Sequence, residues 1–257
     1  TRRRHGFLWQ EHCILTAREL LGESFTGTSN VYLAMKHGLE AKGTNAHELP
    51  MVFAALARQR FPGDAEALRQ SQYKVLQRWQ NQYSGNLLVF LPDTYGTTQF
   101  LKGAPQWVSY WTGARPDSKE PIAAGEELLA FWGRVGAMPE TVAAKKLIIF
   151  ADGLDVALPG AEPNGADIPS IQRHFAGRVQ AGFGWGTNFT NDFIGCDPQG
   201  AERMKPLSLV CKVAAVNGDP AVKLSDNHAK ATGPAEEVAV YRAVFGSEGI
   251  KDAPVKV

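Results

Sequence analysis

The chain has 257 residues and a mass of 28.0 kDa, a length that accommodates one α/β barrel or two modest domains without disulfides or metal to hold the core. Hydrophobic residues make up 44% of the chain and charged residues 21%, which excludes disordered, collagenous and coiled-coil proteins. The 27 Lys and Arg residues balance 26 Asp and Glu residues, so the net charge of +1 predicts neither a nucleic-acid nor a membrane partner.

The first half of the chain alternates helical spacing with short apolar runs. Apolar residues fall on one helical stripe over residues 7–21, and Gly22 ends the predicted helix. The pattern then predicts a strand over 24–26, a short helix over 31–36 and a strand over 39–42. A long helical region covers 46–82, with an interruption near 62–64.

The second half is typical of a parallel sheet. Nearly all-apolar runs at 86–91, 107–111, 147–151 and 179–183 predict strands buried on both faces, and helical spacing returns over 122–135. Asn217 and Gly218 predict an antiparallel hairpin between residues 207–216 and 221–224, followed by a helix over 236–245. The pattern predicts an α/β barrel over 1–206, with the hairpin and terminal helix of 207–257 packed on it.

Polar residues gather where the predicted strands end. They lie at 44–47, 93, 115–117, 152–155 and 184–188. In α/β barrels, ligands bind at the carboxyl ends of the strands, so these five groups should converge on one rim. This placement favours an enzyme.

The turn at 184–188 is suited to phosphate. Gly184 and Gly186 let the backbone approach an anion, successive N–H groups can surround it, and Thr187 adds a hydroxyl, with Asn188 beside it. Taken alone, the pattern also fits a tight turn that merely uses glycine.

His47 stands out among the histidines because a helix is predicted to begin at Ala46. Thr44 or Asn45 can cap that helix, with Glu48 as a capping-box partner. The positive end of the helix dipole would keep the ring neutral and stabilise an anion attached to it. The alternative is an ordinary surface histidine in a first turn.

Charged residues at the strand ends suggest anion and cation binding. The Arg115 guanidinium suits bidentate capture of a carboxylate or phosphate, or it pairs with Asp117. Asp93, Asp117, Asp152 and Asp155 could hold hydrated Mg²⁺ together with substrate phosphates. Any of the four could instead cap a following helix, the interpretation that we favour for Asp152 and Asp155.

Five motifs in order resemble those of the nicotinate phosphoribosyltransferase family. They are TRRR at 1–4, FTGTSN at 25–30, GTNAHE at 43–48, FADGLD at 150–155 and FGWGTN at 183–188. The resemblance runs from Thr1 to the terminal helix. It implies an irregular, TIM-like β/α barrel of the type II phosphoribosyltransferases, which forms nicotinate mononucleotide and pyrophosphate from nicotinate and phosphoribosyl pyrophosphate in NAD salvage.

The resemblance also implies roles for particular residues. His47 would be phosphorylated by ATP, with Mg²⁺ as the expected metal ion. The substrate-binding residues would be Thr44, Arg115, Asp117 and Ser118, and the ribose phosphate would be held by Gly184, Gly186, Thr187 and Asn188. Arg2, Arg4, Asp93 and Asp152 are further candidates near the anionic substrates. A cytoplasmic homodimer is expected, and the three widely spaced cysteines agree with a reducing compartment.

Several alternatives stay open at this point. A related enzyme could act on nicotinamide or quinolinate, or the chain could bind ligands without turnover. An aldolase-like barrel would need a lysine at a strand end, whereas Lys145 and Lys146 precede their strand. Lys119 and Glu120 replace the Gly and Asp of many relatives, which puts contacts near Asp117 in doubt. Family members are longer, so the chain is expected to be their C-terminal part, without the N-terminal domain.

Overall fold

The computed structural model describes residues 6–83, 85, 87–134, 145–156, 167–191, 193, 196–199 and 209–253. Its α-helices are α1 (Phe7–Leu21), α2 (Val31–His37), α3 (Glu48–Arg60), α4 (Ala65–Gln82), α5 (Thr97–Gly103), α6 (Pro121–Arg134), α8 (Ile168–Phe175), α9 (Thr187–Asn191) and α10 (Ala235–Phe245). Its strands are β1 (Val89–Phe90), β2 (Gly113–Ala114), β3 (Leu147–Ala151), β4 (Gln180–Gly184), β5 (Ala215–Val216) and β6 (Asp219–Pro220). Short 3₁₀ helices are η1 (Gly22–Ser24), η2 (Gln106–Tyr110) and η4 (His228–Lys230).

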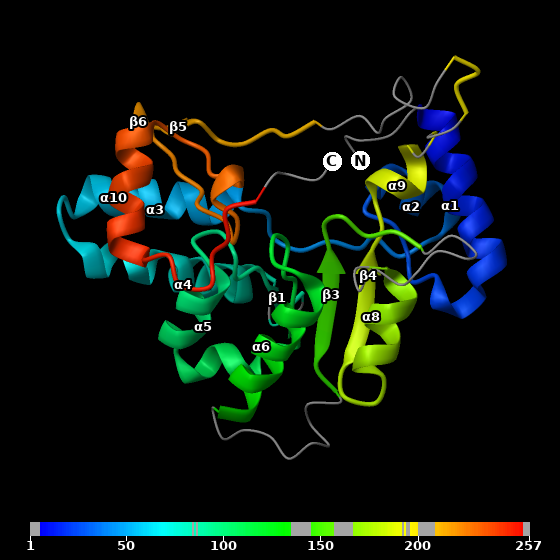
Figure 1. Cartoon of the computed structure of the whole chain (residues 1–257), viewed down its shortest axis with the longest axis horizontal. Helices are drawn as coiled ribbons and strands as arrows, with labels where there is room; N and C mark the ends of the chain where they lie inside the picture. Colours follow the sequence, from blue (N-terminus) through cyan, green and yellow to red (C-terminus); the bar gives the residue numbers. More distant parts are fainter. Residues whose placement is uncertain are drawn as a thin grey trace.

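Four parallel strands form the central sheet in the order β1-β2-β3-β4. Ala114 lies between Phe90 and Ile148 in register, and Ile148 pairs in turn with Ala181. Parallel strands that follow one another in chain order, joined through helices, are the repeating unit of a β/α barrel (Figure 1). Together with the separate β5-β6 hairpin, this sheet confirms the predicted fold class.

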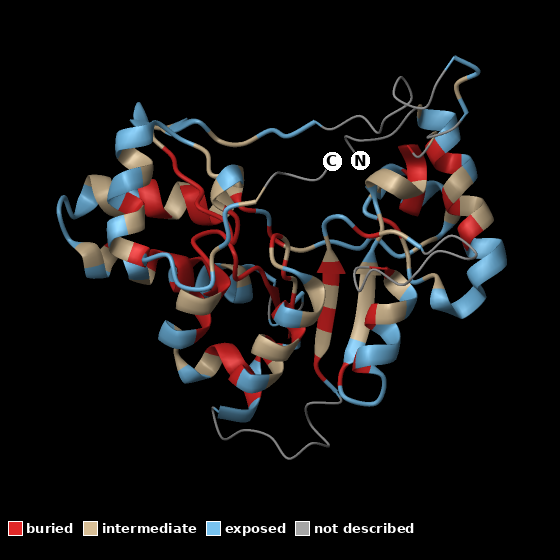
Figure 2. Cartoon of the chain, in the orientation of Figure 1, coloured by how far each residue is buried: buried red, intermediate tan, exposed pale blue. Residues whose placement is uncertain are grey.

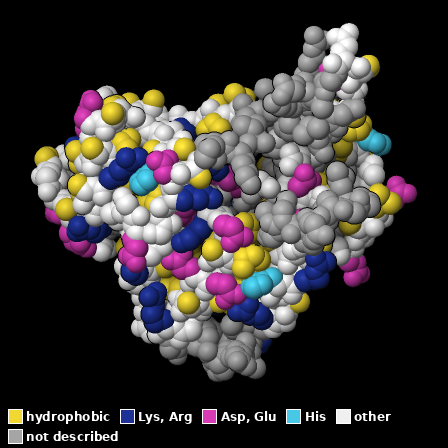
Figure 3. All heavy atoms as spheres, in the orientation of Figure 1, with side chains coloured by type: hydrophobic (Ala, Val, Ile, Leu, Met, Phe, Trp, Pro, Cys, Tyr) yellow, Lys and Arg dark blue, Asp and Glu magenta, His cyan; other side chains and the backbone are white. Residues whose placement is uncertain are grey.

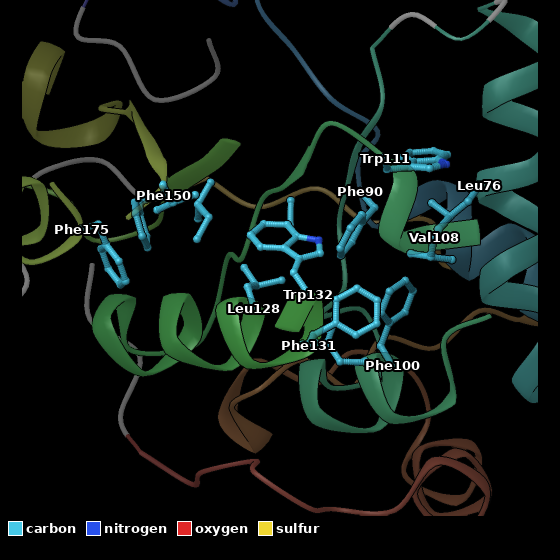
Figure 4. Packing of buried hydrophobic residues seen from close by; sticks show 14 of the residues in the cluster. Leu76, Phe90, Phe100, Val108, Trp111, Leu128, Phe131, Trp132, Phe150 and Phe175 are labelled. Atoms are coloured by element: carbon cyan, nitrogen blue, oxygen red, sulfur yellow. The ribbon is translucent and has the colours of Figure 1, made fainter. Parts of the chain in front are cut away.

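Aromatic side chains fill the core between the sheet and helices α4, α5, α6 and α8 (Figure 4). The Phe90 ring lies 5.6 Å from the Phe100 ring and 6.5 Å from the Phe131 ring, and Trp132 is fully buried beside them. Buried residues lie on the inner faces of the helices, while the outer helix faces are exposed (Figure 2). A Cβ atom at Gly113 would lie 2.0 Å from the Leu147 carbonyl oxygen, so only glycine fits in β2.

A second core joins the C-terminal part of the chain to α3 and α4. Tyr95, which follows β1, stacks on Phe245 of α10 with ring centroids 4.3 Å apart, and Tyr241 packs beside both. The backbone N–H groups of Leu224 and Ser225 both donate to the carbonyl of Thr94. These contacts bring the segment after the hairpin to the end of strand β1.

Several predicted strands differ in the structure. The strand expected over 107–111 is wrong, because the region forms η2 and the short β2 follows it. Val108 and Trp111 are buried while Tyr110 is exposed, and buried residues three apart suit a 3₁₀ turn. The sequence does not reveal this spacing, because nearly every residue of the run is apolar. The strands expected over 24–26 and 39–42 are reduced to one bridge between Thr28 and Ala41.

The helix at the start, the break between α3 and α4, and the terminal helix agree with their predictions. The hairpin turns at Asn217 and Gly218, both with positive φ as a two-residue turn requires. The second strand of the hairpin is β6, which lies earlier in the chain than the predicted 221–224. Of the predicted first strand, residues 207 and 208 lie outside the described residues. No helix in the described part of the chain is both long and apolar enough to cross a membrane.

Candidate active site

The carboxyl ends of the four strands carry the predicted polar groups in a row. Asp93 follows β1, Arg115 follows β2, Asp152 follows β3, and Gly184 ends β4. Because all four strands are parallel, these groups lie along the same edge of the sheet. Four of the five groups that were expected to converge share this edge.

His47 lies at the N-cap of α3, because the helix begins two residues later than the predicted start at Ala46. The helix begins at Glu48, and the carbonyl of His47 accepts the hydrogen bond from the Met51 N–H. The predicted capping box does not form, because His47 rather than Thr44 or Asn45 is the N-cap residue and no side chain caps the helix. The Thr44 hydroxyl donates to the Asn45 carbonyl at 3.1 Å. The ring is 4% exposed, so the alternative of a surface histidine is wrong.

Both ring nitrogens of His47 have polar neighbours. Nδ1 lies 3.0 Å from the hydroxyl oxygen of Thr94. Nε2 lies 3.0 Å from Asp117 Oδ2 and 3.8 Å from Asp93 Oδ1. The ring is therefore held in one orientation, with its Nε2 edge facing two carboxyl groups.

Asp93 is held by a chain of hydroxyl groups. The Ser225 hydroxyl donates to the Ser118 hydroxyl at 2.6 Å, and Ser118 donates to Asp93 Oδ2 at 2.6 Å. Asp93 is fully buried, and its Oδ1 has no hydrogen-bond partner among the described residues. That oxygen faces His47 and is the atom that is ready to take a further ligand.

Asp117 is kept as a carboxylate by its surroundings. Burial alone would raise its pKa, but the hydrogen bond with His47 and the positive charges of Arg115 and Lys223 outweigh burial and hold the pKa well below its usual range. Nη1 of Arg115 lies 3.6 Å from Asp117 Oδ1. The predicted pairing of Arg115 with Asp117 is thus present and leaves other guanidinium donors for a ligand.

Thr44 and Arg115 meet at one carbonyl group. Nη2 of Arg115 donates to the Asn45 carbonyl at 3.2 Å, the same carbonyl that the Thr44 hydroxyl binds. Nε of Arg115 is buried and has no partner among the described residues. The two residues that the resemblance places at nicotinate therefore lie side by side.

Asp152 belongs to the same acidic cluster. It pairs with Lys230, and its backbone has a φ of 77°. Burial raises its pKa, the ion pair with Lys230 opposes the rise, and the charges of Asp117 and Asp93 add to it. We favoured helix capping as the role of Asp152 and Asp155. This prediction is wrong for α8, the next described helix, because its N-cap residue is Asp167.

The turn after β4 leaves room for a ligand. Gly184 and Gly186 do not have positive φ, and a Cβ atom at Gly186 would meet nothing within 4 Å. The backbone conformation therefore does not demand glycine, which disfavours the alternative of a merely tight turn. Thr187 begins α9, and the Asn188 amide donates to Asp155 Oδ2 at 3.1 Å.

Lys119 and Glu120, which differ from the residues of many family members, both bind groups near their own part of the chain. Lys119 pairs with Glu127 and donates to the Thr98 hydroxyl at 3.1 Å. The Glu120 carboxylate accepts the first N–H groups of α6. Neither side chain displaces Asp117 or Ser118. Arg2 and Arg4 lie outside the described residues.

Sequence reasoning missed the segment 223–230, which reaches the site from the C-terminal side. Lys223 is 4% exposed; burial lowers its pKa, and the charges of Asp93 and Asp117 oppose the shift. Ser225 and Lys230 contact the site through Ser118 and Asp152, as described above. The only signal was a run of polar residues directly after the hairpin, which is also typical of an exposed loop.

His47, Asp93 and Asp117 could together hold a metal ion, since one ligand atom from each lies within 4.8 Å of the others. Mg²⁺ prefers oxygen ligands and is usually bound through one or two carboxylates and substrate phosphates. The unpartnered oxygen of Asp93 and the ionised Asp117 fit that preference.

On the face shown in Figure 3, basic and acidic side chains are interspersed, in agreement with the small net charge.

One edge of the parallel sheet carries a buried histidine, paired carboxylates, an arginine and a glycine turn. This arrangement is typical of the active sites of α/β enzymes. A family model described as the nicotinate phosphoribosyltransferase (NAPRTase) family matches residues 1–249, and the chain belongs to this family.

Solved structures of nicotinate phosphoribosyltransferases are similar to the chain over nearly its whole length. The protein from Porphyromonas gingivalis is 30% identical with a TM-score of 0.76, covering 95% of this chain and 57% of that one. The protein from Vibrio cholerae is 29% identical with a TM-score of 0.80, covering 96% of this chain and 54% of that one. The chain thus spans little more than half the length of these relatives.

Proposed function

We propose that the protein transfers phosphoribose from phosphoribosyl pyrophosphate to nicotinate, forming nicotinate mononucleotide and pyrophosphate in NAD salvage. Membership of the family supports this reaction. The observation that carries it is the meeting of Thr44 and Arg115 at the Asn45 carbonyl, with the Arg115 Nε donor buried and unpartnered among the described residues.

Arg115 would bind the nicotinate carboxylate. A guanidinium offers planar, paired donors that match a carboxylate, and in a buried site such a charged hydrogen bond is strong. Thr44 would hold the other side of the ring. The bound base would then present its ring nitrogen in a fixed orientation, which is the main requirement for an in-line attack on the anomeric carbon.

Gly184, Gly186, Thr187 and Asn188 would hold the ribose phosphate. Support comes from the open space above Gly186 and from the position of the turn beside the end of β3. Asp93 and Asp117 would hold Mg²⁺, which when bound neutralises charge on the departing pyrophosphate. Asp117 and Ser118, which follow β2, would also bind substrate; the ion pair of Asp117 with Arg115 and the hydrogen bond from Ser118 to Asp93 support this assignment.

His47 would accept a phosphoryl group from ATP and so couple ATP hydrolysis to the transfer. The N-terminus of a helix stabilises an attached anion, and α3 supplies such an end at this ring. We further propose a cytoplasmic homodimer, with 1–206 as the barrel portion and 207–257 packed on it. The homodimer rests on the resemblance, and the division of the chain rests on the pattern of predicted elements.

Initial rates with nicotinate, nicotinamide and quinolinate test the proposal. Nicotinate should be the preferred base, because Arg115 pairs with one carboxylate and nicotinamide has none. A clear preference for nicotinamide or quinolinate would replace the proposed substrate. Binding of nicotinate mononucleotide by calorimetry, with no turnover of any base, would support the alternative of a ligand-binding protein.

A further inference from the structure

Ser225 is a fully buried residue in a strained backbone conformation. Its φ is 72°, in the left-handed region that a side chain with a Cβ atom disfavours and that glycine adopts readily. Such strain persists only where the surroundings fix the conformation, and it is common at functional sites. The presence of serine here, in place of glycine, therefore calls for a physical reason.

The contacts of the backbone around Ser225 do not supply that reason. The N–H groups of Leu224 and Ser225 donate to the Thr94 carbonyl at 2.9 and 3.1 Å. The Asp226 carboxyl group accepts from the N–H and the hydroxyl of Thr97 at 2.7 and 2.5 Å. These bonds fasten residues 224–226 to the loop after β1, but they use only backbone atoms of residue 225, so glycine would form them equally well.

Serine adds a hydroxyl group, and that hydroxyl leads to Asp93. It donates to the Ser118 hydroxyl oxygen at 2.6 Å, and Ser118 donates to Asp93 Oδ2 at 2.6 Å. A hydroxyl that accepts one hydrogen bond becomes a stronger donor in the next. Ser225 therefore fixes the orientation of Ser118 and strengthens the bond that holds Asp93.

The bond to Oδ2 determines where the other oxygen of Asp93 lies. Oδ1 is 3.8 Å from His47 Nε2 and has no hydrogen-bond partner among the described residues. Asp93 and Asp117 each place a ligand atom within 4.8 Å of the other and of His47. Without the bond from Ser118, the Asp93 carboxyl group would be free to rotate away from this arrangement.

We propose that Ser225 is a positioning residue: its hydroxyl, acting through Ser118, holds Asp93 with Oδ1 directed to the magnesium site. The strained backbone is retained because glycine would relieve the strain but lacks the hydroxyl. Groups that orient metal ligands in this way commonly affect metal affinity strongly. This inference rests on the proposed role of Asp93 and Asp117 in holding Mg²⁺.

Two substitutions separate the hydroxyl from the strain. Ser225→Ala keeps the Cβ atom and its strain but loses the hydroxyl, whereas Ser225→Gly loses both. Ser71→Ala is the matched control, because the Ser71 hydroxyl is also buried and donates to the Leu68 carbonyl within α4. Binding of Mn²⁺, a paramagnetic substitute for Mg²⁺, is measured from the electron paramagnetic resonance signal of the free ion. Thermal melts of the same proteins measure stability.

The wild type and Ser71→Ala should bind Mn²⁺ equally well, and both Ser225 variants should bind it about tenfold more weakly or worse. Ser225→Gly should nevertheless melt at a higher temperature than Ser225→Ala, because glycine tolerates the positive φ. Wild-type affinity in Ser225→Gly, with or without a loss in Ser225→Ala, would overturn this inference alone. A wild type that binds no Mn²⁺, or an Asp93→Asn variant that binds it as the wild type does, would overturn the magnesium role of Asp93 and that of Ser225 with it.

Discussion

Asp226 is a buried carboxylate whose ionisation should weaken the fold at neutral pH. It accepts hydrogen bonds from the backbone N–H and the hydroxyl of Thr97, at 2.7 and 2.5 Å. Burial, assisted by the negative charge of Asp93, raises its pKa from 3.8 to about 6. The residue is 1% exposed, so bulk water does little to screen these effects.

The direction of the pH effect follows from this raised pKa. The folded chain binds the proton of Asp226 more tightly than the unfolded chain does, so the associated stability is present below about pH 4 and is lost as the pH rises through 6. A shift of about 2 pKa units corresponds to about 3 kcal/mol, of which about half is lost between pH 5 and pH 8.

Asp226→Asn tests this reasoning, because asparagine has the shape of the protonated carboxyl group and cannot ionise. At pH 8 the free energy of unfolding of the variant should exceed that of the wild type by up to about 3 kcal/mol, and at pH 5 by about half as much. Urea unfolding followed by tryptophan fluorescence measures both differences. Asp252→Asn, at an exposed carboxyl group, is the control and should follow the wild type. A variant that is less stable than the wild type at pH 8, or an excess that does not grow between pH 5 and pH 8, would refute the reasoning.

Three further substitutions have definite expected outcomes. His47→Asn should abolish acid-labile phosphate incorporation from ATP while some ATP-independent activity remains; unchanged labelling would remove His47 from the mechanism. Arg115→Ala should raise the KM for nicotinate by at least about tenfold, as expected for loss of a charged hydrogen bond, and an unaltered KM would reject its carboxylate role. Gly113→Ala should destabilise the fold by more than about 3 kcal/mol, because the added Cβ would lie 2.0 Å from the Leu147 carbonyl oxygen. Gly133→Ala, where a Cβ meets nothing within 4 Å, is its control and should be neutral or stabilising in a thermal melt.

The strand-end groups could be predicted because parallel strands obey a general rule. Strands were placed correctly before Asp93 and Gly184, so these two groups had to share one edge of the sheet. The strand predicted before Arg115 was wrong, because residues 107–111 lie mostly in η2 and Arg115 follows the short β2 instead. The placement of His47 at a helix start followed in the same way from the residues around it. Local pattern and sheet topology were therefore sufficient to find most of the site.

The partners that complete the site could not be predicted, because they come from distant parts of the chain. Thr94 contacts a histidine 47 residues away, and Ser225 reaches Ser118 across 107 residues. Periodicity describes which face of an element is buried and says nothing about which elements meet. The 3₁₀ turn at η2 was missed for a related reason, since a run in which nearly every residue is apolar has no readable period.

Formation of nicotinate mononucleotide from nicotinate and phosphoribosyl pyrophosphate, measured with and without ATP, tests the central claim most directly. The proposed function predicts that the product forms and that ATP increases both its rate of formation and its final amount. Absence of nicotinate mononucleotide under both conditions would contradict the proposed reaction, and equal formation under both conditions would contradict the coupling to ATP through His47.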